Sequence, residues 1–227
     1  MKKMQWDSVF WGIDIFHLTK IETLEFDQVM DKNFLIQALP NVSDLTFIHE
    51  LEDNNFKFQE SKITFIKRNE ELKIDFSQFK PLLASELKPY KEYFFQLYGG
   101  NSRFNVFSHK KVNEFYYQWL VNSSSGKMDD ECIGFYVNGK LAAFVTYKIN
   151  KNCIDIGLLG VFPDYRGQGI SQSLLSYIDR LAVDSSIEYI RVSTQGRNTN
   201  AINAYIKYGF QIKSIDHWYY YIKGELK

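Results

Sequence analysis

The segment 158–170 constrains the fold more than any other stretch, because three kinds of local structure follow one another within it. An apolar, strand-like run ends in the turn residues Pro163 and Asp164. The loop Arg166-Gly167-Gln168-Gly169 comes next. Apolar residues then recur with the spacing of one helix face, at Ile170, Leu174, Ile178 and Leu181. The sequence therefore predicts a strand, a glycine loop and the start of a helix, in that order.

This loop has the properties of an anion-binding site. Its glycines let backbone N–H groups approach a ligand closely, and the first N–H groups of the following helix have no partner within that helix. The helix dipole favours the same negative charge, and Arg166 adds a cation. We therefore predict a phosphate or pyrophosphate ligand. The loop lacks the Gly-Lys-Ser/Thr of a Walker loop, and Gln172 stands where a dinucleotide fingerprint needs its third glycine.

The loop resembles the acyl-CoA pyrophosphate loop of the GNAT N-acetyltransferase superfamily, Q/R-x-x-G-x-G/A. Arg166, Gly169 and Ser171 occupy its three defined positions, and Ser171 replaces the usual glycine or alanine with another small residue. The alternative for this stretch alone is a plain glycine turn before a helix.

A second segment strengthens the resemblance. Residues 198–210 match the superfamily pattern N-x-x-A-x-x-x-Y-x-x-x-G-F, with Asn198, Ala201, Tyr205 and Gly209-Phe210 in register. Asn198 is also a good helix N-cap, and Gly209 a good helix stop. With both motifs in the right order, the chain is identified as a member of the superfamily, over roughly residues 90–227.

The resemblance implies an α+β GNAT fold, in which helices flank a mixed, mostly antiparallel central sheet. It implies an acyl-CoA-binding catalytic domain over 91–227, with acetyl-CoA or a similar acyl-CoA as the donor and no metal. Tyr205 matches the tyrosine that protonates the departing sulfur, and its alternative is a core aromatic. Asn198 matches the residue on the pantetheine arm, and its alternative is a simple helix cap. The other implied cofactor-binding residues are Leu159, Gly160, Val161, Arg166, Gly167, Gln168, Gly169, Ile170 and Ser171.

Asp155 is the candidate general base. It lies on the same predicted strand, and period-2 geometry puts Asp155, Gly157, Leu159 and Val161 on one face. A carboxylate within an apolar run is costly unless it is paired or functional. The alternatives are a structural hydrogen-bond acceptor, or a water chain with no dedicated base.

Residues 1–90 lack these motifs and are predicted to form a smaller N-terminal α/β accessory domain on the acceptor side. Their opening, residues 5–12, resembles the W-D-S-x-F-F-G start of TDP-fucosamine acetyltransferases and related nucleotide-sugar N-acyltransferases. This resemblance implies acyl transfer to the amine of a dTDP-linked 3- or 4-amino-dideoxyhexose, for surface polysaccharide synthesis. Arg103 is the candidate for the acceptor pyrophosphate, because a guanidinium suits phosphate oxygens. The candidates for stacking on thymine are Trp6, Phe10, Tyr98 and Phe104.

Other local patterns place the remaining elements. Residues 112–120 have helical apolar spacing, and Asn138-Gly139 predicts a tight hairpin between strands 133–137 and 140–149. The other predicted strands are 62–67, 73–76, 153–161 and 189–194, followed by an antiparallel pair at 210–215 and 218–222.

Composition narrows the functional class. Lys+Arg and Asp+Glu both number 27, so a zero net charge argues against nucleic-acid binding. No apolar run approaches the ~18 residues of a membrane span, so a cytoplasmic protein without membrane contact is expected. The resemblance suggests a homodimer, with 218–221 as part of its interface. The alternatives for function are a protein N-terminal or lysine acetyltransferase and a non-catalytic CoA-binding regulator.

Overall fold

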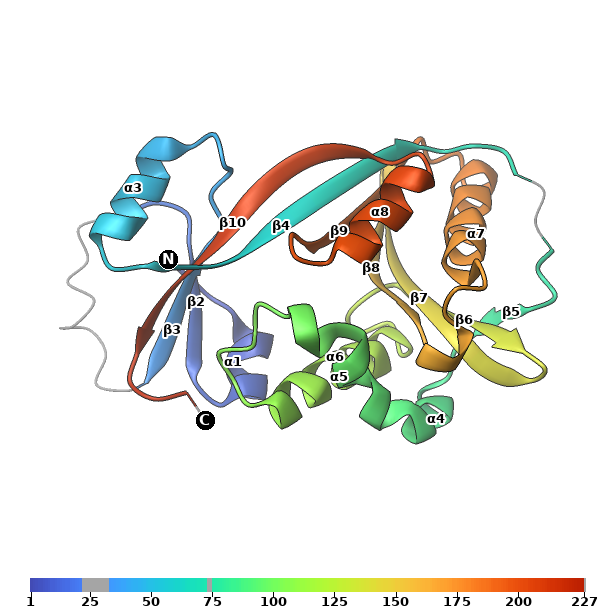
Figure 1. Cartoon of the computed structure of the whole chain (residues 1–227), viewed down its shortest axis with the longest axis horizontal. Helices are drawn as coiled ribbons and strands as arrows, with labels where there is room; N and C mark the ends of the chain where they lie inside the picture. The colour runs from blue at the N-terminus through green and yellow to red at the C-terminus, as the bar shows by residue number, and fades with distance from the viewer. Residues whose placement is uncertain (22–32, 73–74, 227) are drawn as a thin grey trace.

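The computed structural model describes residues 1–21, 33–72 and 75–226. Its strands form one sheet of ten, in the order β1-β2-β3-β10-β4-β9-β8-β7-β6-β5 (Figure 1). Only the β2–β3 and β8–β9 pairs are parallel, so the predicted mixed, mostly antiparallel sheet is confirmed. The strands are β1 Lys2–Lys3, β2 Asp14–Leu18, β3 Phe34–Ala38, β4 Lys57–Arg68, β5 Phe79–Pro81, β6 Glu131–Val137, β7 Lys140–Asn150, β8 Cys153–Val161, β9 Tyr189–Gln195 and β10 Gln211–Lys223.

Helices cover both faces of this sheet. The helices are α1 Gln5–Trp11, α3 Leu45–Asp53, α4 Ala84–Leu87, α5 Phe94–Tyr98, α6 His109–Ser123, α7 Ile170–Asp184 and α8 Thr199–Lys207, with short 3-10 turns at Lys88–Tyr93, Gly99–Asn101 and Pro163–Tyr165. The predicted helix over 112–120 lies within α6. Among the helices described, none is long and apolar enough to cross a membrane.

The hairpin between β6 and β7 forms where it was predicted. Asn138 and Gly139 have φ of 50° and 75°, as a two-residue turn with two left-handed residues requires. Asparagine and glycine tolerate that conformation at low cost, so the local sequence fixes the turn.

Residues 1–90 are part of the same sheet as the rest of the chain. Strand β4 lies between β9 and β10 and pairs antiparallel with both, so that Phe65 faces Val192 on one side and Ile212 on the other. The boundary predicted at residue 90 therefore does not separate two sheets. The predicted strand 62–67 lies within β4. Of the strand predicted at 73–76, residues 73–74 lie outside the described residues and 75–76 are not in a strand.

The prediction of a terminal antiparallel pair was wrong. Residues 211–223 form one long strand, β10, whose irregularities after Ile212 and Trp218 let it follow the twist of the sheet. This strand lies inside the sheet between β3 and β4, and Tyr219 and Tyr220 are buried. Segment 218–221 is therefore paired on both sides within the sheet and has no open strand edge.

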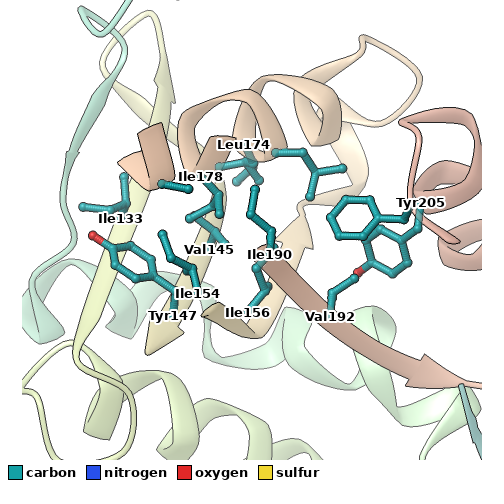
Figure 2. Packing of buried hydrophobic residues seen from close by; sticks show 14 of the residues in the cluster. Ile133, Val145, Tyr147, Ile154, Ile156, Leu174, Ile178, Ile190, Val192 and Tyr205 are labelled. Carbon is teal, nitrogen blue, oxygen red and sulfur yellow. The ribbon is translucent and has the colours of Figure 1, made fainter. Parts of the chain in front are cut away.

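The described residues form three apolar clusters: the smallest packs α3 against β2, β3 and β10, and the two larger ones lie on opposite faces of the sheet. One packs α7 and α8 against β6–β9 and contains Ile178, Val192 and Tyr205 (Figure 2). The other packs α1, α5 and α6 against the opposite face and contains Trp11, Phe115 and Phe144. Successive residues of β7, such as Phe144 and Val145, point into different cores, as expected for a strand buried on both faces.

Strands β8 and β9 pair over only part of their length. The parallel pairing runs from Cys153–Tyr189 to Ile156–Val192 and then ends, while β8 continues along β7 and β9 continues along β4. The two strands therefore diverge beyond Ile156 and open the centre of the sheet.

A bulge in β8 coincides with this divergence. The register against β7 shifts between the pairs Ile156–Tyr147 and Leu159–Val145. The Leu158 N–H donates to Thr146 Oγ1 (2.8 Å), and that hydroxyl donates to the buried carboxylate of Asp129 (2.6 Å). The Thr146 hydroxyl, held by Asp129, thus satisfies the Leu158 N–H, which the bulge removes from the hydrogen bonds between the two strands.

The bulge overturns one prediction. Asp155, Gly157, Leu159 and Val161 do not share a face, because the extra residue reverses the alternation between 157 and 159. Leu159 and Val161 pack on the α7 core, whereas a Cβ on Gly157 would lie 2.5 Å from Asp129, on the opposite face.

Candidate active site

A cleft of about 820 Å³ lies where β8 and β9 diverge. Helix α8 borders it on one side, and α5 and α6 border it on the other (Figure 1). The structure brings most of the predicted site residues into this one cleft. They are Tyr98, Arg103, Phe104, Leu159, Gly160, Val161, Arg166, Gly167, Gly169, Ile170, Ser171, Asn198 and Tyr205.

The glycine loop forms one end of the cleft. Gly167 and Gly169 have φ of 77° and 78°, and Gly169 is the N-cap of α7. Across the described part of the chain, the backbone N–H groups of 167–171 have no hydrogen-bond acceptor. Among the described residues of the predicted loop, only Gln168 does not line the cleft. Its side chain instead donates to the Asp164 carbonyl (3.4 Å).

Arg166 supplies the cation at this end. Its Nε donates to the Val161 carbonyl (3.3 Å), and the residue is exposed. No carboxylate of the described residues forms an ion pair with it. Five free N–H groups beside an unpaired guanidinium make a fitting cradle for a pyrophosphate.

Asn198 combines both roles considered for it. Its Oδ1 accepts the Ala201 N–H (3.3 Å) and so caps α8, and its Nδ2 donates to Thr194 Oγ1 (3.1 Å). The residue also lines the cleft. The cap fixes the start of the helix that carries Tyr205.

Tyr205 lies where the α7 core meets the cleft. Its ring packs on Phe65 (5.6 Å between centroids) and Phe210 (5.8 Å), and Figure 2 shows it beside Val192. Burial raises the pKa of its phenol above the usual value. The hydroxyl therefore stays protonated at neutral pH and can act as a hydrogen-bond or proton donor.

Arg103 forms the opposite end of the cleft. Its guanidinium is stacked between the rings of Phe104 (3.9 Å) and Trp218 (3.8 Å). It donates to Gln37 Oε1 (2.7 Å) and to the Tyr220 hydroxyl. Within the described residues it has no carboxylate partner at ion-pair distance, so its positive charge is held rigidly and left for a ligand.

Sequence reasoning missed two residues at this end. Lys62 on β4 and Trp218 on β10 line the cleft with Arg103. Burial lowers the pKa of Lys62, although the nearby Asp216 carboxylate opposes this. Polar and apolar residues alternate in both strands as in many other strands, so no local sequence pattern distinguished Lys62 and Trp218 as site residues.

Trp6 and Phe10, which were predicted to contact a ligand, do not line the cleft. Both pack against Phe115 of α6, with centroids 5.2 and 5.3 Å away. Ser8 links α1 to β2, since its hydroxyl donates to the carbonyl of Met4, the N-cap of α1 (2.7 Å), and accepts the N–H of Ile15 on β2 (2.9 Å). The opening motif therefore builds a helix that supports α6.

Asp155 faces a second hollow of about 450 Å³. Its two oxygens accept from Arg191 Nε (2.5 Å) and Nη2 (2.6 Å), and Asn150 also donates to it (2.5 Å). Lys62 and Ser193 line both hollows, but Asp155 does not line the main cleft. The structure thus matches the alternative of a structural hydrogen-bond acceptor.

We therefore expect Asp155→Asn to leave kcat unchanged. The substitution removes a half-exposed ion pair, worth about 1 kcal/mol or less, so only a small loss of stability should accompany it. Steady-state rates and urea denaturation of the variant check both points. A fall in kcat of about 100-fold, the size of a general-base effect, would return Asp155 to the mechanism.

No metal centre is present among the described residues, where no group of three or more His, Cys, Asp or Glu side chains lies close enough to hold an ion.

A mixed, mostly antiparallel sheet flanked by helices is the fold that the GNAT resemblance implied, and the glycine loop and Tyr205 line one cleft in it. The model of the Acetyltransferase (GNAT) family matches residues 90–210, and the chain belongs to this family.

Two curated relatives are similar over part of their length. An uncharacterised N-acetyltransferase of Methanocaldococcus jannaschii is 27% identical over 152 residues, covering 63% of this chain and 61% of the relative. The dTDP-fucosamine acetyltransferase of Escherichia coli O6:H1 is 30% identical over 108 residues, covering 47% and 46%. The chain thus spans less than two thirds of the length of either.

Solved structures share the fold. A GCN5-related N-acetyltransferase of Sphaerobacter thermophilus has a TM-score of 0.58 at 13% identity, covering 85% of this chain and 61% of that one. The PaiA N-acetyltransferase of Thermoplasma acidophilum, solved in complex with coenzyme A, has a TM-score of 0.51 at 17% identity, covering 66% and 98%.

Proposed function

We propose that this protein transfers an acyl group, acetyl or somewhat larger, from acyl-CoA to the amine of a dTDP-linked 3- or 4-amino-dideoxyhexose. The observation that carries this proposal is the single cleft lined by the anion-binding loop, by Tyr205 and by Arg103. One end of the cleft is built for the donor's pyrophosphate and the other for an anionic acceptor.

The donor end fits acyl-CoA. The free N–H groups of 167–171 and Arg166 would hold its pyrophosphate, and the backbone of 159–161 would hold its pantetheine arm. A Cβ on Gly160 would lie 2.7 Å from Phe144, so the chain keeps this position without a side chain. Bound acyl-CoA supplies a thioester, whose C–S bond breaks as the C–N bond to the acceptor forms.

Tyr205 would assist the break. Its hydroxyl donates to the sulfur as negative charge develops there, which lowers the barrier to thiolate departure. Asp155 takes no part in this step, because its oxygens are bonded to Arg191 in the neighbouring hollow. The proton of the attacking amine leaves through water, since a sugar amine is partly neutral near pH 7.

The acceptor end fits a nucleoside diphosphate. The free edge of the Arg103 guanidinium suits two phosphate oxygens, and Lys62 adds a second positive charge. Trp119 of α6 and Trp218 of β10 also line the cleft and supply aromatic surface for a base or a sugar. A protein acceptor, with its lysine or N-terminal amine, carries no diphosphate for Arg103 and Lys62 to bind. The similarity to the dTDP-fucosamine acetyltransferase supports the same acceptor class.

The test is thiol release from acetyl-CoA with dTDP-linked 3-amino- and 4-amino-dideoxyhexoses as acceptors. Saturable turnover with one of them, and none with the free amino sugar, is the expected result. Turnover with peptide amines instead would replace this proposal with a protein acetyltransferase. CoA binding without turnover on either class would make the protein a CoA-binding regulator.

Arg103→Lys is expected to raise KM for the nucleotide sugar by about tenfold or more, because lysine keeps the charge but loses the bidentate fork. KM for acetyl-CoA should stay the same, since the donor binds at the other end of the cleft. Steady-state kinetics with each substrate varied in turn separates the two effects. Equal rises in both KM values would show a general disturbance of the cleft.

A further inference from the structure

Tyr98 has a buried hydroxyl with no partner. The residue ends α5, and its ring stacks on Tyr116 with centroids 4.7 Å apart and an angle of 26°. Among the described residues no group hydrogen-bonds to its hydroxyl, although the residue lines the cleft. Tyr116 therefore covers one face of the ring, while the hydroxyl lies in the wall of the cleft without a partner.

The hydroxyl lies at the acyl end of the cleft. A Cβ on Gly160 would lie 3.0 Å from the Tyr98 oxygen, which places that oxygen directly beside β8. Gly160 belongs to the stretch 159–161 that faces the proposed thioester site. The phenol of Tyr205 is close enough to add to the rise in the pKa of Tyr98, which is caused mainly by burial. Two phenols thus approach the same region, one from α5 and one from α8.

An orphaned buried hydroxyl costs free energy in the free protein, because it has lost water without gaining a partner. A ligand that supplies an acceptor recovers this loss. The acceptor expected beside Gly160 is the carbonyl oxygen of the acyl group, where negative charge develops as the amine attacks. A donor fixed in advance and shielded from water is most effective at such a position.

We infer that Tyr98 is a catalytic residue, whose hydroxyl donates to the acyl carbonyl oxygen while Tyr205 donates to the departing sulfur. This inference rests on the proposed acyl transfer from acyl-CoA, but not on the identity of the acceptor. Tyr98 keeps its proton throughout, so no covalent step passes through it.

Tyr98→Phe tests the inference with two readouts. We expect kcat to fall by about 100-fold, as when one donor to a developing oxyanion is removed. The unfolding temperature of the ligand-free protein should not fall, because the hydroxyl has no protein partner to lose. A loss of stability without a loss of kcat would make Tyr98 a structural residue and overturn the inference.

A binding measurement adds a readout that does not depend on turnover. Calorimetry compares CoA with an unreactive acetyl-CoA analogue in which a CH2 group replaces the thioester sulfur, so that the carbonyl keeps its position. Tyr98→Phe should reduce the preference for this analogue by about two- to tenfold, one neutral hydrogen bond, and leave the affinity for CoA unchanged. An unchanged preference would overturn the inference, whereas failure of dTDP-sugar turnover would overturn only the proposed acceptor.

Tyr219→Phe is the matched control. Tyr219 is also buried, but it lies on β10 outside the cleft and its hydroxyl donates to Glu52 (2.8 Å). Its substitution should therefore lower stability and leave kcat and the carbonyl preference unchanged. Tyr98→Phe should therefore lower kcat without lowering stability, and Tyr219→Phe should lower stability without lowering kcat, which separates catalysis from packing.

Discussion

Replacing Asp179 with alanine is expected to lower the free energy of unfolding by about 3 kcal/mol, near the lower end of the cost of breaking a buried ion pair, because Lys67 keeps a second ion pair with the exposed Glu70 (3.3 Å). Asp179 on α7 is fully buried and accepts both Lys67 Nζ (3.0 and 3.1 Å) and the Glu70 N–H (3.0 Å). The pair ties β4 to the helix that carries the pyrophosphate loop. Urea denaturation of the variant and the parent gives the difference.

A double variant controls for the loss of charge. Lys67→Met with Asp179→Leu replaces both ions with apolar groups of similar size, which often restores most of the stability. The single variant should therefore be less stable than the double variant. Equal losses in both would show that packing around α7, rather than an uncompensated charge, sets the cost.

Tyr205→Phe is expected to lower kcat by more than tenfold, and general-acid assistance of this kind is typically worth about 10²–10⁴ in rate. KM for acetyl-CoA should change little, because the loop and the strand backbone hold the donor. The ring is retained, so its packing on Phe65 and Phe210 stays intact. Steady-state kinetics together with CoA calorimetry measures both quantities.

The pH profile gives an independent check on Tyr205. Burial raises its pKa, so the phenol remains protonated, and remains a donor, on the alkaline side of its ordinary value of about 10. Activity of the parent enzyme should therefore not decline through ionisation of this group between pH 7 and 10.

Tyr208→Phe is the control for the Tyr205→Phe substitution, since the Tyr208 hydroxyl bonds to Ser176 and Tyr208 does not line the cleft. An unchanged kcat in Tyr205→Phe would remove the residue from the mechanism.

The donor end of the site could be predicted because its determinants are local. The loop glycines, the cap at Asn198 and Tyr205 all lie within short segments whose spacing specifies a turn or a helix start. The Asn138-Gly139 turn was predictable for the same reason.

The acceptor end could not be predicted in the same way. Arg103 was predicted, but Lys62 and Trp218 were not, because they come from distant strands that meet only where β4 lies beside β10. An alternating strand pattern does not name its neighbour in a sheet. The prediction that Asp155 shares a face with Leu159 and Val161 was wrong because a bulge held by Thr146 and Asp129 reversed the alternation, and a single residue of extra length leaves no clear trace in the sequence.

The place of β4 also governs how the chain can fold during synthesis. Strand β10 inserts between β3 and β4, so β3 and residues 57–66 of β4 pair with a strand more than 140 positions further along the chain. Until β10 has left the ribosome, β4 lacks one neighbour and keeps an open edge able to pair with other chains. Folding should thus be slow and occur largely after translation, as expected when the stabilising contacts span most of the sequence. A nascent chain stalled before residue 211 should expose this edge and depend on chaperones, even though its pyrophosphate loop is already complete.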